Sequence, residues 1–178
     1  MSPDLEKKLI ENYPEIFPDT GGASLLEAGW GLSVGDGWYD ILDVLCGQLV
    51  APLRSAENHL RYLDSHMDKS AGAHKITPED IKKEEENITR LRAGIPHAVQ
   101  VKEKFGGLRF YIGGGATEEQ YAFISFAEEM SYRVCELCGG RAQPYPLGWV
   151  RTLCEHHAVE IHGQKAVDYL ESKRKSSQ

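Results

Sequence analysis

One arrangement of cysteine and histidine residues constrains how the C-terminal third of this sequence can fold. Cys135 and Cys138 are separated by two residues, and fifteen residues later Cys154 and His157 repeat that spacing. Two such pairs, each on its own turn, supply four donors in the tetrahedral arrangement that zinc prefers. The spacing therefore predicts a zinc-binding segment with Cys135, Cys138, Cys154 and His157 as its ligands.

Other interpretations of these residues remain open. His156 is the neighbouring candidate for the fourth ligand, although the two-residue spacing favours His157. A redox Cys-x-x-Cys pair, or unrelated buried thiols, would leave the second pair at ligand spacing by coincidence. A disulfide is disfavoured in a reducing cytosol. Cys46 lies among leucines at helical spacing, so we expect it to be a buried thiol.

Four protein ligands leave no open position at which a metal ion can activate water, so such a site stabilises a fold. We therefore expect a structural zinc ion and not the catalytic zinc of a hydrolase. A zinc-dependent nucleobase deaminase would also need a glutamate two residues after a ligating histidine, and no such pair precedes Cys135.

Hydrophobic periodicity predicts helices along most of the chain. A short helix is expected from Pro3, a long one from Trp38, and a charged one after the start signal at Thr77. A capping box at Thr117 predicts a further helix. The last helix is expected to end near Ser172.

One β-hairpin is predicted between these helices. Residues 98–104 and 108–112 form its strands around a Phe-Gly-Gly turn, with Val99 and Val101 on one face. The predicted fold class is therefore α+β, with a helical N-terminal part, a β-hairpin, and a zinc-stapled C-terminal segment that ends in a helix.

Composition divides the chain into three regions. Residues 1–64 form an acidic helical region with a glycine- and tryptophan-rich turn. Residues 65–95 form a linker and a charged helix, which we expect to be an insertion, and residues 96–178 contain the hairpin, a helix and the zinc-binding segment. Residues 1–64 contain 4 Lys and Arg against 11 Asp and Glu, which accounts for the net charge of −7.

The acidic first region repels phosphate backbones, so the chain cannot bind nucleic acid over its whole surface. An acidic surface suits a basic protein partner better. Nucleic acid would need a local patch, for which Lys102, Lys104, Arg109 and Arg151 are the candidates. An ordinary solvated sheet face explains the same residues.

The glycine-rich stretch 29–39 predicts a tight turn packed beneath large aromatic rings. Trp38 begins a stripe of apolar residues at helical spacing, so we expect its indole to be buried. The alternative is an exposed aromatic patch of Trp30, Trp38 and Tyr39 that binds a partner.

A set of carboxylates offers a nuclease-like alternative. Asp36 and Asp40 are four residues apart, and Asp43, Glu103 and Lys104 would complete the set. Nothing in the sequence places Glu103 beside the aspartates, and the helix dipole already favours acidic residues in a first helical turn.

No apolar run approaches the roughly 18 residues that a membrane span requires. The N-terminus shows no basic stretch followed by an apolar one. We expect a cytoplasmic protein with no membrane partner, and the sequence leaves its oligomeric state open.

Several motifs together resemble a family of small phage- and prophage-encoded proteins. They are GDGWY at 35–39, VQVKEKFGGLRFY at 99–111, CELCG at 135–139, and GWVRTLC with the following histidine at 148–157. The similarity covers most of the chain except residues 65–95. The resemblance implies a phage accessory role in the cytoplasm of a bacterial host, such as inhibition of a bacterial defence system.

These observations predict a phage-encoded, non-enzymatic binding protein that contains structural zinc and acts on a host or phage protein. The alternative is a nucleic-acid-binding accessory factor that uses the hairpin and the zinc segment. A nuclease or hydrolase is the third hypothesis.

Overall fold

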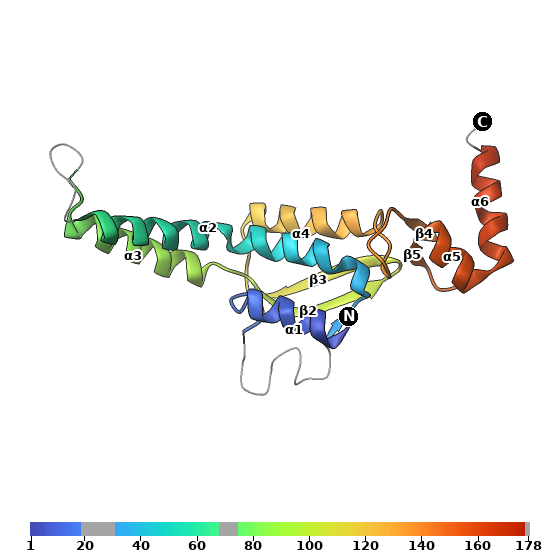
Figure 1. Cartoon of the computed structure of the whole chain (residues 1–178), viewed down its shortest axis with the longest axis horizontal. Coiled ribbons are helices and arrows are strands. Elements are labelled where there is room, and N and C mark those ends of the chain that lie inside the picture. The colour runs from blue at the N-terminus through green and yellow to red at the C-terminus, as the bar shows by residue number, and fades with distance from the viewer. Residues whose placement is uncertain (19–30, 68–74, 177–178) are drawn as a thin grey trace.

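The computed structural model describes residues 1–18, 31–67 and 75–176. It is elongated: a helical arm extends from one end of a central α+β body, and a small module with the C-terminal helix lies at the other end (Figure 1). The predicted α+β class is confirmed, and so is the order of helical part, hairpin and cysteine-bearing segment.

Two antiparallel helices form the arm. Helix α2 (Tyr39–His66) leaves the body, and α3 (Pro78–Ala93) returns along it after a capping box in which Thr77 accepts from the Asp80 amide. Both helices were predicted, and they pack through a small apolar seam (Leu53, Ala56 and Ile88). No helix in the described ranges is both long and apolar enough to cross a membrane.

The central sheet has three strands in the order β1-β2-β3. The predicted hairpin is formed by β2 (His97–Lys104) and β3 (Gly107–Gly113), and its two turn residues have φ values of 55° and 79°. Positive φ at both central residues is typical of the type I′ turn, whose twist matches that of paired strands. The parallel strand β1 (Leu32–Ser33) was not predicted, because two residues show no alternation.

The predicted orientation of Val99 is wrong. The register between β2 and β3 shifts between Ala98 and Gln100, as at a β-bulge. Strict alternation of side chains between the two faces of the sheet is therefore broken at this point. The Val99 side chain is consequently 48% exposed, while Ala98 and Val101 are both buried. Beyond the bulge the predicted alternation holds.

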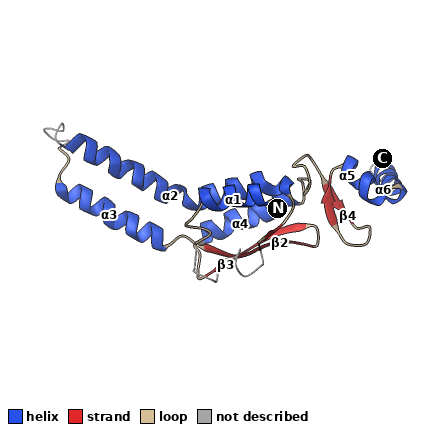
Figure 2. Cartoon of the chain, turned by 60° about the horizontal axis from the view of Figure 1, so that its bottom comes forward, coloured by secondary structure: helices blue, strands red, loops and turns tan. Residues whose placement is uncertain are grey.

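Helices α1 (Pro3–Asn12), α2 and α4 (Glu118–Ser131) all lie on one side of the sheet (Figure 2). Their buried side chains join Val101 and Phe110 of the sheet in one core. This core takes residues from both sides of the 65–95 segment. Trp38, at the end of the 3-10 helix η1 (Asp36–Trp38), is fully buried in it, as predicted.

Side chains of α4 accept hydrogen bonds from two amides at the free edge of β3. The Leu108 amide donates to Oγ of Ser131 over 2.8 Å, and the Phe110 amide donates to a carboxylate oxygen of Glu128 over 2.9 Å. Helix α4 is thereby fixed both against the sheet face and along its edge.

The C-terminal module contains a two-stranded sheet and two helices. Strands β4 (Gln143–Tyr145) and β5 (Arg151–Leu153) pair antiparallel, and α5 (Glu155–His162) and α6 (Gln164–Ser176) follow. The prediction of one helix ending near Ser172 is wrong. Gly163 lies between the two helices, and its φ of 57° interrupts the helical backbone. Glycine adopts this conformation more readily than residues that carry a side chain.

Candidate metal centre

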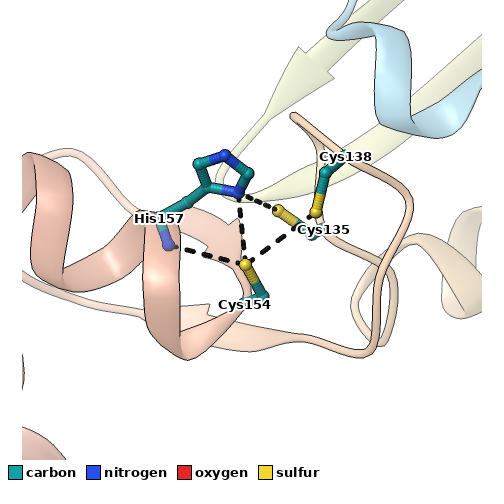
Figure 3. A group of neighbouring side chains, drawn as sticks. All are labelled: Cys135, Cys138, Cys154 and His157. Carbon is teal, nitrogen blue, oxygen red and sulfur yellow. Dashed lines mark hydrogen bonds between the residues drawn. The ribbon is translucent and has the colours of Figure 1, made fainter.

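The structure brings Cys135, Cys138, Cys154 and His157 together (Figure 3). The first two lie on the loop between α4 and β4, which we call the knuckle (residues 135–140). Cys154 is the N-cap residue of α5, and His157 lies in the first turn of that helix. The one ligand atom that each side chain offers lies within 4.8 Å of the other three, so the group can hold a metal ion.

Individual distances show how the donors face one another. Nδ1 of His157 lies 3.2 Å from Sγ of Cys154 and 3.4 Å from Sγ of Cys135. Sγ of Cys138 lies 3.9 Å from Sγ of Cys154. The imidazole therefore presents Nδ1, and not Nε2, to the sulfur atoms of Cys135 and Cys154.

Local backbone geometry places the two knuckle sulfurs side by side. The Cys135 amide donates to the Gly140 carbonyl over 2.7 Å, and the Gly139 amide donates to the Cys135 carbonyl over 2.9 Å. This reversal needs the positive φ of 73° at Gly139, which glycine adopts without steric cost.

The polar surroundings favour the thiolate form of Cys135. Burial alone would raise the pKa of this thiol, but backbone hydrogen bonds from Cys154, Cys138 and Leu137 and a hydrogen bond with His157 lower the pKa to about 7. Metal ions bind the thiolate and not the thiol, so this lowered pKa prepares the residue for coordination near neutral pH.

His156 lies outside the group of sulfurs. Its side chain is 80% exposed, and its Nε2 lies 3.8 Å from a carboxylate oxygen of Glu160, one helical turn later on α5. With the half-buried His157, these two exposed residues form a second set of potential donors. The position of His156 on the solvent side of α5 agrees with the preference for His157.

A pair of substitutions distinguishes the two histidines. We expect His157→Ala to weaken zinc affinity by at least the 10–100-fold that is typical of losing a mere supporting contact. His156→Ala should leave the affinity unchanged, because its ring is in solvent. Competition with a chromophoric chelator measures both variants, and an equal loss in both would contradict the assignment.

The glycine-rich turn before α2 lies directly against the knuckle. The Gly37 amide donates to the Glu136 carbonyl over 2.8 Å, and Nε1 of Trp38 donates to the Val134 carbonyl over 2.8 Å. A Cβ at Gly37 would lie 2.1 Å from the Cys135 carbonyl oxygen, and one at Gly35 would lie 2.2 Å from that of Glu136. Glycine is needed here because two backbones approach closely.

The contact between the turn and the knuckle was not predicted from the sequence. The glycines at 35 and 37 were attributed to the conformation of the turn, whereas neither has positive φ. Their density was the only signal in the sequence, and glycine density alone does not identify the backbone that approaches.

Three of the four basic candidates lie together. Lys102 and Arg109 are opposite each other in β2 and β3, and Lys104 is two residues from Lys102, which places all three on the outer face of the sheet. Arg151 is on β5, and its guanidinium lies 3.5 Å from a carboxylate oxygen of Glu136. Three of the four candidates therefore share one face of the sheet, and Arg151 lies on β5 beside the hairpin turn at Gly106.

The nuclease-like carboxylates do not converge. Asp36 accepts a hydrogen bond from the Ser2 amide over 2.6 Å, and Asp43 accepts one from the Tyr13 hydroxyl over 2.9 Å. Glu103 binds at the hairpin turn, where it accepts from the Gly106 amide. Within the described ranges, the potential metal clusters include none of these carboxylates.

Comparison with known proteins adds no assignment to this geometry. No protein-family model matches the chain, and neither a curated protein nor a solved structure matches it. The function must therefore be inferred from the arrangement of the chain's own residues.

Proposed function

We propose that this protein is a non-enzymatic binding protein whose structural zinc ion fixes the relative position of the sheet and the C-terminal module. The observation that carries this proposal is the closed group of Cys135, Cys138, Cys154 and His157. Three thiolates and one imidazole are a common ligand set of structural zinc sites.

Three of the six separations between the donors are close to those of a tetrahedral zinc site. Bond lengths of about 2.3 Å for zinc–sulfur and about 2.0 Å for zinc–nitrogen give donor separations of about 3.8 Å between sulfurs and about 3.5 Å between sulfur and nitrogen. The observed sulfur pair is separated by 3.9 Å, and the two sulfur–nitrogen pairs by 3.2 and 3.4 Å. Calcium or magnesium would instead require oxygen donors.

The zinc site lies where three parts of the chain meet. The Glu136 carbonyl of the knuckle accepts a hydrogen bond from the Gly37 amide of the turn. The Thr152 carbonyl of β5 accepts a hydrogen bond from the Glu136 amide. The Thr152 hydroxyl donates a hydrogen bond to the Gly106 carbonyl at the tip of the hairpin. Because zinc holds the knuckle to α5, its loss would release both the turn and the hairpin tip from the module.

One structural observation bears on the class of partner, and it favours nucleic acid. The sequence predicted a host or phage protein as the partner, and this remains a prediction, as does the inhibition of a defence system implied by the resemblance. The nucleic-acid alternative is favoured by Lys102, Lys104 and Arg109, which share the outer face of the sheet.

A cobalt-substituted protein tests whether the site is closed. We expect about one zinc ion per chain in the purified protein, and replacement by Co²⁺ should give the absorption of tetrahedral thiolate coordination. Adding azide should leave that spectrum unchanged, because four protein ligands leave no position for it. A spectrum that shifts with azide would reveal an open, catalytic type of site and contradict the proposal.

A further inference from the structure

We propose that the outer face of the β2–β3 hairpin binds single-stranded nucleic acid. The binding residues are three cations (Lys102, Lys104 and Arg109) and two aromatic side chains (Phe105 and Tyr111). The inference rests on the proposed function, because the zinc-bound module fixes the hairpin tip, and it names the class of partner.

The outer face carries three positively charged side chains. Lys102 lies directly opposite Arg109, and like charges in that position destabilise a sheet. Among the described residues, no carboxylate forms an ion pair with Lys102, Lys104 or Arg109. A polyanionic ligand would neutralise the three cations together, although the chain as a whole is negative.

The nearest carboxylates are already engaged. Glu103 accepts from the Gly106 amide over 2.6 Å and from Nε1 of Trp149 over 3.0 Å. Glu128 accepts the Phe110 amide at the edge of β3. Glu103 alternates with Lys102 and Lys104 along β2 and therefore belongs to the other face of the sheet. Glu128 lies at the edge of β3, where its charge acts on Arg109 without forming an ion pair.

Aromatic rings accompany the cations. Phe105, at the hairpin turn, is 62% exposed, and Tyr111, on β3, is 40% exposed. The ammonium of Lys104 lies 5.4 Å from the Phe105 ring centroid, and that of Lys102 lies 5.3 Å from the Tyr111 ring centroid. Exposed rings beside cations are what proteins use to stack unpaired bases and bind their phosphates.

Arg109 is held in place for this role. Its guanidinium donates to the Tyr132 hydroxyl over 2.9 Å, and the Tyr132 ring passes over Gly107, where a Cβ would lie 2.3 Å from a ring carbon. The hydrogen bond with Tyr132 raises the pKa of Arg109, so the cation is permanent. A fixed guanidinium loses less side-chain entropy on binding phosphate than a free one.

Single strands fit this surface better than a duplex. Helices α1, α2 and α4 lie on the opposite side of the sheet (Figure 2), and none of the described helices covers its outer face, so that face offers no helix for the major groove. Stacking on Phe105 and Tyr111 requires bases that are not already stacked within a duplex. A three-stranded sheet with exposed rings meets that requirement.

Binding of the full, zinc-loaded chain to a fluorescein-labelled oligo(dT) or oligo(U) tests the proposal by anisotropy. Three phosphate contacts predict that the logarithm of affinity falls with the logarithm of salt with a slope of about −2, at about −0.7 per contact. Lys104→Gln should therefore make the slope shallower by about 0.7.

The aromatic contribution is tested with Phe105→Asn. Asn-Gly is the preferred sequence of a type I′ turn, so this variant removes the ring while favouring the hairpin. Loss of one stacking ring should weaken binding about tenfold with little change in salt slope. The matched control for Lys104→Gln is Lys82→Gln on α3, which removes one exposed lysine from the arm.

Several outcomes would overturn the assignment. They are an unchanged anisotropy at low salt with zinc-loaded chain, tighter binding to a duplex of the same length, or equal weakening by Lys104→Gln and Lys82→Gln. A protein partner captured through this face, in place of oligonucleotides, would overturn it as well. A chain that contains no zinc contradicts the proposed function instead, whatever the oligonucleotides do.

Discussion

Cys138→Ser is expected to abolish stable zinc binding and to unfold the C-terminal module while the central body stays folded. The thiol is exposed, so a smaller hydroxyl fits without a clash and only the ligand is lost. Zinc binding contributes on the order of 10 kcal/mol to folding in small zinc domains, which is comparable with the whole stability of a typical domain. Hydrogen exchange should show lost protection over 141–176 and retained protection in α2.

The reason for this division is that the module's core is small. The central core contains residues from three helices and the sheet. The buried cluster of the module contains only six residues, which are Cys135, Tyr145, Leu153, Ala158, Ala166 and Leu170. Cys46→Ala is the control. Cys46 is buried in the central core, so this variant protein should keep its zinc content. Full zinc content and unchanged exchange in Cys138→Ser would refute the assignment of this ligand.

Trp38→Ala should lower the free energy of unfolding by about 3–5 kcal/mol, the usual cost of deleting a large buried aromatic side chain. The indole is fully buried, and its loss also leaves the Val134 carbonyl without its donor. That carbonyl is only part-buried, so the lost hydrogen bond does not take the cost beyond this range. Chemical denaturation followed by circular dichroism measures the difference.

Trp149→Ala supplies the matched control for this prediction. Trp149 is 66% exposed and bonds only to Glu103 at its indole nitrogen, so its removal should change stability by less than about 1 kcal/mol. A Trp38→Ala variant that is as stable as Trp149→Ala, and that has lost a partner, would place Trp38 in a binding surface.

Local signals in the sequence were sufficient for most helices. The capping boxes at Thr77 and Thr117 are both formed, because such boxes depend on residues three positions apart. The four metal donors were found for the same reason, since each pair lies within one turn. Trp30 lies outside the described ranges, so its membership of an exposed aromatic patch stays a prediction.

Features set by distant contacts could not be predicted. Strand β1 exists because Leu32 pairs with Val101, and the glycines at 35 and 37 are explained only by the knuckle about 100 positions later. The bulge that exposes Val99 likewise depends on the register of the partner strand. Pattern within a window reports local preference, whereas these features depend on tertiary packing.

The hydrogen bonds from β3 to α4 have a consequence for self-association. An unprotected edge strand offers a row of N–H and C=O groups on which a strand from another molecule can add, which begins many aggregates. Here the Leu108 and Phe110 amides already donate to Ser131 and Glu128. Copies of the chain therefore cannot extend the sheet through these amides, even when the protein is concentrated.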